Sequence, residues 1–142
     1  MDVYDSATRS RVMSKVKSSD TKVELAVRRA VHAAGLRFRL HPASLPGKPD
    51  LVFAGIRTAV FVNGCFWHQH AGCSHASIPA SNREYWEAKL GRNVTRDRSV
   101  SDALRAAGWQ VEVLWECQAR GDELDGLITR LLKRRSAQRA GR

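Results

Sequence analysis

The spacing of apolar residues predicts a helix near the start of the chain. Between positions 21 and 34 they recur every three or four residues, which is the period of a helix with one apolar face. Asp20 or Thr21 can cap the amino end, Glu24 follows Thr21 at capping-box spacing, and Gly35 ends the run. We therefore expect a helix over residues 21–34. Further helical patterns cover residues 82–90, 94–107 and 122–133, with the first two joined at Gly91 and rich in Arg and Lys on one face.

Short segments rich in β-branched and aromatic residues predict four strands. They span residues 36–40, 50–54, 58–63 and 110–115. The segment HPASLPGKP breaks regular structure between the first two strands, and Gly55 suits a tight hairpin between the second and third. The order of helices and strands predicts an α/β sandwich, in which a central mixed β-sheet is flanked by helices.

The length of 142 residues fits one domain with a single core. Residues 1–20 are polar and mixed in charge, so we expect an N-terminal arm that lies on the surface or on a ligand. Residues 21–135 would form the folded domain, and residues 136–142 a basic, flexible tail.

The chain is strongly basic, with a net charge of +10 and a pI of about 10.4. Such an excess of Lys and Arg predicts binding to a polyanion, because neutralised phosphates release their counterions. An anionic membrane surface would also attract the charge, and the charge could alternatively serve solubility alone. Since no long apolar run or signal-like start occurs, we expect a soluble intracellular protein that does not bind membranes.

Three cysteines and a histidine have spacing that favours structural zinc over disulfides, because three thiolates and one imidazole make a closed tetrahedral shell. The set is Cys65, His70 and Cys73 in one irregular loop, with Cys117 after the last strand. His68 and His75 are alternative sources of the imidazole. Three buried free cysteines beside incidental histidines would give the same pattern.

Asp50 follows Pro49 at the start of a predicted strand, which suits a magnesium ligand carried on a rigid element. The strand over residues 58–63 would present its end to the same ion, and an Asp with one backbone carbonyl can suffice as protein ligands. Magnesium would stabilise charge on a scissile phosphate and help to generate the attacking hydroxide. An Asp after Pro can equally cap a turn.

The segment NGCFWH at residues 63–68 places two large aromatic residues beside a proposed zinc ligand. At least one of Phe66 and Trp67 is expected to face outward, where an aromatic side chain can unstack DNA bases. They could instead cover the zinc loop as a small core. His68 is placed to move a proton near Asp50.

Five blocks of the sequence resemble the very-short-patch-repair (Vsr) mismatch endonucleases. They are ATRSRVM, LPGKPDLVF, FVNGCFWH, NREYWEAKLGRNVTRDR and GWQVEVLWEC, in register over residues 5–120. The resemblance implies a restriction-endonuclease-like fold and an enzyme that nicks DNA on the 5′ side of the thymine in a T:G mismatch, left when 5-methylcytosine deaminates.

The resemblance also implies a role for each matching residue. Asp50 and the backbone carbonyl of Val62 would bind Mg²⁺, while Glu24 and His68 would act through water. The N-terminal arm would clasp the duplex, with Met13 entering from the minor-groove side. The remaining implied sets are the zinc ligands Cys65, His70, Cys73 and Cys117, the major-groove wedge Phe66, Trp67 and Trp86, and the mismatch contacts Lys89 and Asn93.

Two departures from the family pattern bear on this assignment. Many relatives carry Thr-His at the positions of Val62 and Asn63. Asn63 in place of that His removes one proton-handling or phosphate-contacting group from the catalytic set, and His68 must carry more of that role. We expect activity to survive with Asn63. The loop over residues 69–72 is slightly longer than in some relatives, which affects the assignment of His70 as the zinc ligand.

The leading hypothesis is therefore a mismatch-nicking repair enzyme, acting as a monomer on double-stranded DNA in the bacterial cytoplasm and at the nucleoid. Mismatch-repair proteins or a repair polymerase are the expected protein partners. A related nuclease for another lesion or for foreign DNA is one alternative, and a non-catalytic, zinc-stabilised DNA-binding protein is the other. Asp50, Glu24 and His68 favour catalysis, because phosphate binding alone calls for Lys and Arg.

Overall fold

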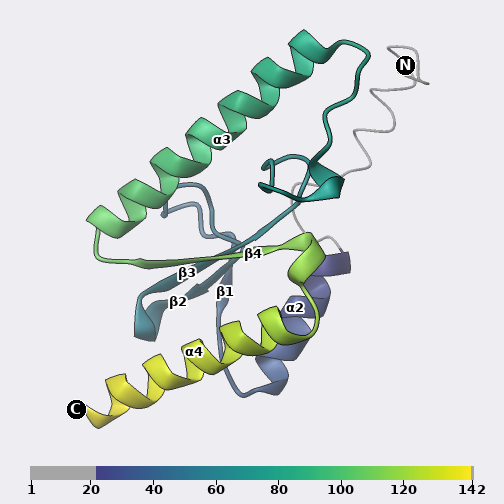
Figure 1. Ribbon diagram of the computed structural model, residues 1–142. Coiled ribbons are helices and arrows are strands. Elements are labelled where there is room, and N and C mark those ends of the chain that lie inside the picture. Colours follow the sequence, from purple (N-terminus) through teal and green to yellow (C-terminus); the bar gives the residue numbers. More distant parts are fainter. Residues whose placement is uncertain (1–21, 142) are drawn as a thin grey trace.

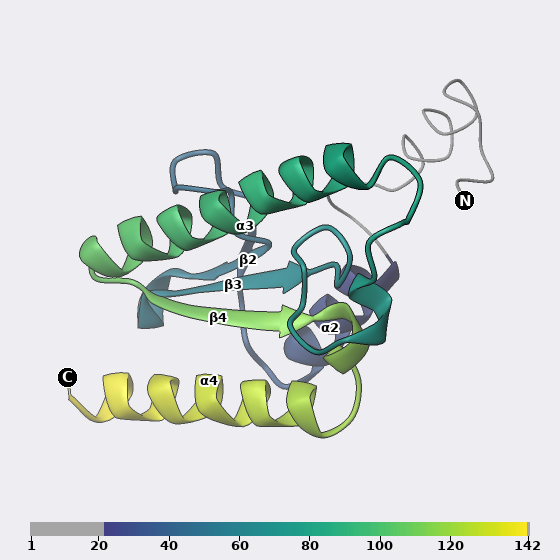
Figure 2. The ribbon, with the colours of Figure 1, turned by 45° about the horizontal axis from the view of Figure 1, so that its top comes forward.

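The computed structural model describes residues 22–141 (Figure 1). In this part of the chain, a four-stranded sheet lies between helices on its two faces (Figure 2). The helices are α2 (Lys22–Ala33), α3 (Arg83–Ala106) and α4 (Asp122–Ala140), and the strands are β1 (Arg39–Leu40), β2 (Leu51–Phe53), β3 (Thr58–Asn63) and β4 (Gln110–Trp115). The expected α/β sandwich with a mixed sheet is confirmed.

The strands lie in the order β1-β2-β3-β4. The first three are antiparallel neighbours, and β4 runs parallel to β3 with Val62 opposite Leu114. A parallel neighbour needs a long crossover, which α3 provides. Because β3 and β4 end at the same edge, the loop after β3 and the turn after β4 meet there, at the right of Figure 2.

The main core lies between the sheet and the pair α2 and α4. Its buried residues come from alternate strand positions, as expected when one face of a strand packs inward. They are Val27, Val31, Leu36, Leu51, Phe53, Val60, Leu114, Ala119, Leu124, Leu127 and Leu131. Val27 and Val31 confirm the amphipathic pattern that predicted α2.

The opposite face of the sheet is covered by α3 (Figure 2). Val52 and Ala59, which alternate with the residues of the main core, are buried there, and α3 contributes Trp86, Leu90 and Leu104. The segment before β2 also approaches α3 closely. Gly47 has a positive φ of +73°, and a Cβ at this position would lie 2.5 Å from Val100 Cγ1.

Two helices differ from the sequence-based expectation. The segments 82–90 and 94–107 form one helix that runs through Gly91. A glycine weakens a helix by roughly 1 kcal/mol relative to alanine but does not break it, and the buried residues on both sides hold α3 on the sheet. At the other end of the chain, α4 continues past position 133 to Ala140.

Long-range contacts explain the extra turns of α4. Arg134 forms a 2.7 Å ion pair with Glu112 on β4, and Arg135 donates a 2.8 Å hydrogen bond to the Gly35 carbonyl. The expected tail at 136–142 is thus helical as far as residue 140. The expected arm at residues 1–20, including Met13, lies outside the described residues. Among the helices within residues 22–141, none has the length and apolar character needed to cross a membrane.

Candidate active site

A polar cleft of about 430 Å³ opens beside Asp50 and the end of β3. The antiparallel pairing of β2 and β3 sets this position, because Leu51 lies opposite Val60 and the residue before β2 therefore lies beside the end of β3. The residues that line the cleft are His41, Gly47, Lys48, Asp50, Phe61, Val62, Asn63 and His68.

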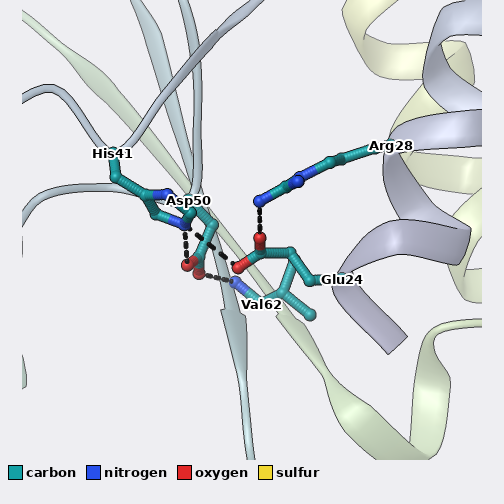
Figure 3. A network of polar contacts seen from close by, with 5 residues as sticks. All are labelled: Glu24, Arg28, His41, Asp50 and Val62. Carbon is teal, nitrogen blue, oxygen red and sulfur yellow. Dashed lines mark hydrogen bonds and ion pairs between the residues drawn. The ribbon is translucent and has the colours of Figure 1, made fainter. Parts of the chain in front are cut away.

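Two carboxylates and an imidazole converge at this cleft. His41 Nε2 lies 3.2 Å from Glu24 Oε1 and 3.3 Å from Asp50 Oδ1 (Figure 3). Glu24 comes from α2, His41 follows β1, and Asp50 precedes β2, so three elements supply the group. Arg28, one turn after Glu24, pairs with the other oxygen of the Glu24 carboxylate. The grouping could hold a metal ion, since its three ligand atoms lie within 4.8 Å of one another.

Burial makes the cleft a poor place for uncompensated negative charge. Desolvation and the neighbouring Glu24 carboxyl raise the pKa of Asp50 from 3.8 to about 7, against the smaller opposing effects of the Val62 N–H and His41. At neutral pH this carboxyl binds a proton far more readily than an exposed aspartate does. A divalent cation could replace that proton and would favour the charged form.

The backbone at Val62 points toward Asp50. Its N–H donates a 2.6 Å hydrogen bond to Asp50 Oδ2. In a regular strand, the N–H and the C=O of one residue point to the same side, so the Val62 carbonyl also faces the Asp50 side. The structure thus brings together the two groups that the sequence nominated for magnesium.

His68 and Asn63 border the same cleft from the end of β3. Asn63 is buried, while His68 Nδ1 lies 2.6 Å from Asp97 Oδ2 on α3. A carboxylate at Nδ1 favours the tautomer with its proton on that atom, which leaves Nε2 to accept a proton. Asp97 lies outside the cleft lining and contacts the cleft residue His68.

Three aromatic rings pack together where the loop after β3 meets the start of α3. Phe66 contacts Trp67 and Trp86 edge to face, with ring centroids 5.1 and 5.5 Å apart. Trp86 is only 3% exposed, whereas Phe66 and Trp67 are half-buried. Trp86 therefore supports the other two rings from below, and Phe66 with Trp67 forms the accessible part of the predicted wedge.

The two predicted mismatch contacts lie on α3 beside these rings. Lys89 Nζ is 5.8 Å from the Trp67 ring centroid, and Asn93 Nδ2 donates a 3.2 Å hydrogen bond to the Trp67 carbonyl. Both side chains are half-buried. Their placement joins the basic helix to the aromatic cluster.

The predicted zinc ligands are gathered in a second cluster at the same edge of the sheet. Cys65 Sγ lies 3.8 Å from His70 Nδ1, Cys117 Sγ lies 3.4 Å from that nitrogen, and Cys73 Sγ lies 4.0 Å from Cys117 Sγ. Ligands about 2.3 Å from a tetrahedral zinc are separated by about 3.8 Å. The four side chains could therefore hold a zinc ion with little movement.

Local contacts hold His70 and its loop in place in this cluster. The His70 ring stacks on Trp115, with centroids 4.3 Å apart and planes 9° apart. Gln69 donates side-chain hydrogen bonds to the Phe66 and Ala76 carbonyls, which hold the loop in shape. Partial loss of solvent and the nearby thiols of Cys65 and Cys73 raise the pKa of Cys117 to about 11. Three adjacent thiolates therefore require a cation.

The structure adds three polar residues, two in the cleft and one beside it, that the sequence did not nominate. His41 and Lys48 line the cleft, and Asp97 contacts His68. The signal for the first two was their place in HPASLPGKP, a loop that begins at His41 and leads directly into Asp50. Asp97 carried no such signal, because it lies in the middle of a helix among other charged residues.

A Glu-His-Asp group beside the strand ends of a mixed α/β sheet, in a chain of net charge +10, fits one class of protein, the DNA endonucleases with a restriction-endonuclease-like fold, and the family comparison agrees. The family model described as DNA mismatch endonuclease Vsr matches residues 1–74. The chain belongs to the Vsr family of DNA mismatch endonucleases.

Relatives in several bacteria match most of the chain. The DNA mismatch endonuclease Vsr of Escherichia coli K12 is 43% identical over 122 residues, covering 86% of this chain and 78% of that protein. The type II nicking enzyme V.XorIIP of Xanthomonas oryzae is 45% identical over 123 residues, covering 87% and 88%. The type II nicking enzyme V.NmeAIP of Neisseria meningitidis is 38% identical over 119 residues, covering 84% of each chain.

Proposed function

We propose that this protein is a magnesium-dependent repair enzyme that nicks double-stranded DNA on the 5′ side of the thymine in a T:G mismatch. The observation that carries the proposal is the convergence of Asp50, Glu24 and the Val62 backbone at one cleft, in a chain of the Vsr family. Relatives named as a mismatch endonuclease and as nicking enzymes support cutting of one strand at a mismatch.

The donor set of the cleft fits magnesium, which takes oxygen ligands from one or two carboxylates and keeps several waters. Asp50 and the Val62 carbonyl would hold the ion, and Glu24 would accept hydrogen bonds from water beside it. Bound there, magnesium supplies positive charge that stabilises the developing negative charge on the phosphate. Lys48 adds a cation at the mouth of the same cleft.

The chain's own residues would handle the protons of hydrolysis. A water oxygen bonds to phosphorus, one phosphoester bond breaks, and the departing oxygen takes a proton from a solvent water. His68, with Nδ1 held by Asp97, offers Nε2 to accept the proton of the attacking water. Asn63 can donate or accept a hydrogen bond beside the phosphate but cannot transfer its proton, so it has a positioning role.

The aromatic cluster and the cysteine cluster complete the proposal. Phe66 and Trp67, supported by Trp86, would enter the major groove and stack beside the mismatch, with Lys89 and Asn93 contacting its bases. Zinc held by Cys65, His70, Cys73 and Cys117 would fix the loop that carries the wedge. Met13 and the arm at residues 1–20 would clasp the duplex from the minor-groove side.

The cellular setting follows from the same proposal. Bacterial relatives and the proposed DNA substrate support a location in the bacterial cytoplasm, at the nucleoid while the enzyme acts. We propose that it acts as a monomer, with mismatch-repair proteins or a repair polymerase completing the repair after the nick.

The direct test is a nicking assay with end-labelled duplexes that differ at one base pair. We expect Mg²⁺-dependent cutting of one strand in the T:G duplex, 5′ of the thymine, and little cutting of matched T:A or C:G duplexes. Equal cutting of the matched duplexes would favour a nuclease for other lesions or foreign DNA. Binding without cutting would favour a non-catalytic DNA-binding protein and would refute the expectation that activity survives with Asn63.

The wedge can be tested by replacing Trp67 with alanine. We expect Trp67→Ala to weaken binding to T:G duplex by roughly tenfold or more, because stacking on a base contributes about 1–3 kcal/mol. Trp109→Ala is the matched control, since Trp109 is also half-buried but follows the other end of α3. Fluorescence anisotropy measures both, and equal losses in the two variants would contradict the wedge.

A further inference from the structure

We propose that His41 binds the same divalent ion as Asp50 through its Nε2 atom, and that it shifts the metal preference of the cleft from Mg²⁺ toward transition ions such as Mn²⁺ and Co²⁺. The inference rests on the proposed function, in which Asp50 holds a divalent cation. It concerns His41, which lies outside the five sequence blocks that resemble the Vsr family.

The first support is geometric. Two ligand atoms at right angles, each about 2.1 Å from an octahedral ion, are separated by about 3.0 Å. His41 Nε2 lies 3.2 Å from Glu24 Oε1 and 3.3 Å from Asp50 Oδ1 (Figure 3). An ion bound by His41 Nε2 and Asp50 Oδ1 needs shifts of only a few tenths of an ångström, and the Glu24 carboxylate lies within 4.8 Å of both groups.

The second support is the bonding that the imidazole allows. Nε2 carries at most one proton, directed along one line in the plane of the ring, so it cannot donate well to two carboxylates at once. Here the carboxylates of Glu24 and Asp50 both face that nitrogen. A cation bound by His41 and Asp50, with Glu24 beside it, attracts both carboxylates and accepts the lone pair of the neutral ring.

The chemical consequence is a change in metal preference. Mg²⁺ prefers oxygen ligands, whereas imidazole nitrogen suits transition ions, whose affinities rise from Mn²⁺ to Co²⁺. His41→Gln keeps a polar side chain but removes the ring nitrogen. We expect it to weaken Co²⁺ binding roughly tenfold or more, while Mg²⁺ binding changes by less than about threefold.

Pulsed EPR of Mn²⁺ bound to the zinc-loaded protein tests the bond directly, since Mn²⁺ does not favour the thiolates of the second cluster. Wild type should show nitrogen coupling of a bound imidazole, which changes in [¹⁵N]histidine-labelled protein. His41→Gln should abolish it, and the matched variant His32→Gln, at an exposed histidine of α2, should retain it. Retention in His41→Gln, or loss in His68→Gln instead, would overturn the inference.

Calorimetric titration with Co²⁺ and Mg²⁺ completes the test and separates two kinds of failure. If wild type nicks T:G duplex and binds Mg²⁺ but shows no nitrogen coupling, only the role of His41 is wrong. Equal weakening of Co²⁺ and Mg²⁺ binding in His41→Gln would also overturn it. If wild type binds neither ion and Asp50→Asn changes nothing, the proposed metal site itself is wrong.

Discussion

Asp50→Asn should lose nicking activity and yet make the metal-free protein more stable above neutral pH. The loss of activity should be roughly 10³-fold or more, because a catalytic metal ion stabilises the transition state by several kcal/mol and each 1.36 kcal/mol is tenfold in rate. Asparagine presents a neutral amide in place of the carboxylate and binds a divalent ion poorly.

The gain in stability follows from the raised pKa of Asp50. In the folded protein its pKa is about 7, against an ordinary 3.8, mainly because the carboxyl is desolvated. The folded protein therefore binds this proton more tightly than the unfolded chain does. The resulting stabilisation is fully present below pH 3.8 and is lost as pH rises to about 7.

Asparagine avoids that loss, because it is neutral at every pH and its carbonyl can still accept the Val62 N–H. Its amide N–H₂ can also donate to the Glu24 carboxylate. We expect the free energy of unfolding of Asp50→Asn to exceed that of wild type by an amount on the order of 2 kcal/mol at pH 8. The difference should shrink as pH falls toward 4.

Urea unfolding of zinc-loaded protein without added Mg²⁺ measures this difference at several pH values. Asp102→Asn is the matched control, since it makes the same exchange at an exposed position on α3. If the variant is less stable than wild type at pH 8, desolvation of the charged Asp50 carboxylate does not destabilise the fold as assigned. Nicking at the wild-type rate would contradict the assigned metal site.

The two longest strands were predictable from sequence because their pattern is local. Both β3 and β4 have the bounds that the sequence predicted, and the hairpin between β2 and β3 turns through Gly55 with Arg57 in a left-handed conformation. The apolar positions that define these strands are neighbours in sequence. Cysteine spacing was similarly local for Cys65 and Cys73, and the parallel pairing of β4 brings Cys117 to them.

The predicted helix bounds were wrong where contacts between distant parts of the chain determine the structure. Gly91 was expected to separate two helices, but the buried residues on either side hold α3 as one helix. A Cβ at Gly91 would have no neighbour within 4 Å. The last turns of α4 depend on Arg134 and Arg135, whose partners lie on β4 and after α2. A local pattern does not contain these partners.

The same reason explains which cleft residues were missed. His41 faces a carboxylate 17 positions away, and Asp97 faces a histidine 29 positions away. Asp50 was nominated from its place at the start of a strand and Val62 from the family pattern, and the antiparallel register brings their neighbourhoods together. The roles of all these residues remain predictions that the variants proposed for the cleft can test.

Cys117→Ser should have the second large effect, through loss of zinc from the cysteine cluster. Cys117 is exposed, so exchanging sulfur for oxygen there removes little packing, and any large loss of stability must come from the metal. The ion would join the turn after β4 to the loop after β3, which has few apolar residues of its own. Metal binding of this kind contributes directly to folding free energy.

We expect the variant to bind less than one zinc per chain and to unfold at a temperature lower by an amount on the order of 10 °C. Because the loop carries Phe66 and Trp67, binding to T:G duplex should fall with the zinc content. Elemental analysis, thermal unfolding and anisotropy measure the three effects on one preparation.

His75→Ala is the control that tests the choice of histidine. His75 is exposed in the same loop and lies outside the cluster, so its variant should keep zinc, stability and DNA binding. His70→Ala removes the imidazole that stacks on Trp115 and should lose zinc affinity. Zinc retained in Cys117→Ser, or lost in His75→Ala but not in His70→Ala, would refute this ligand set, because the geometry offers no other imidazole to the three sulfurs among residues 22–141.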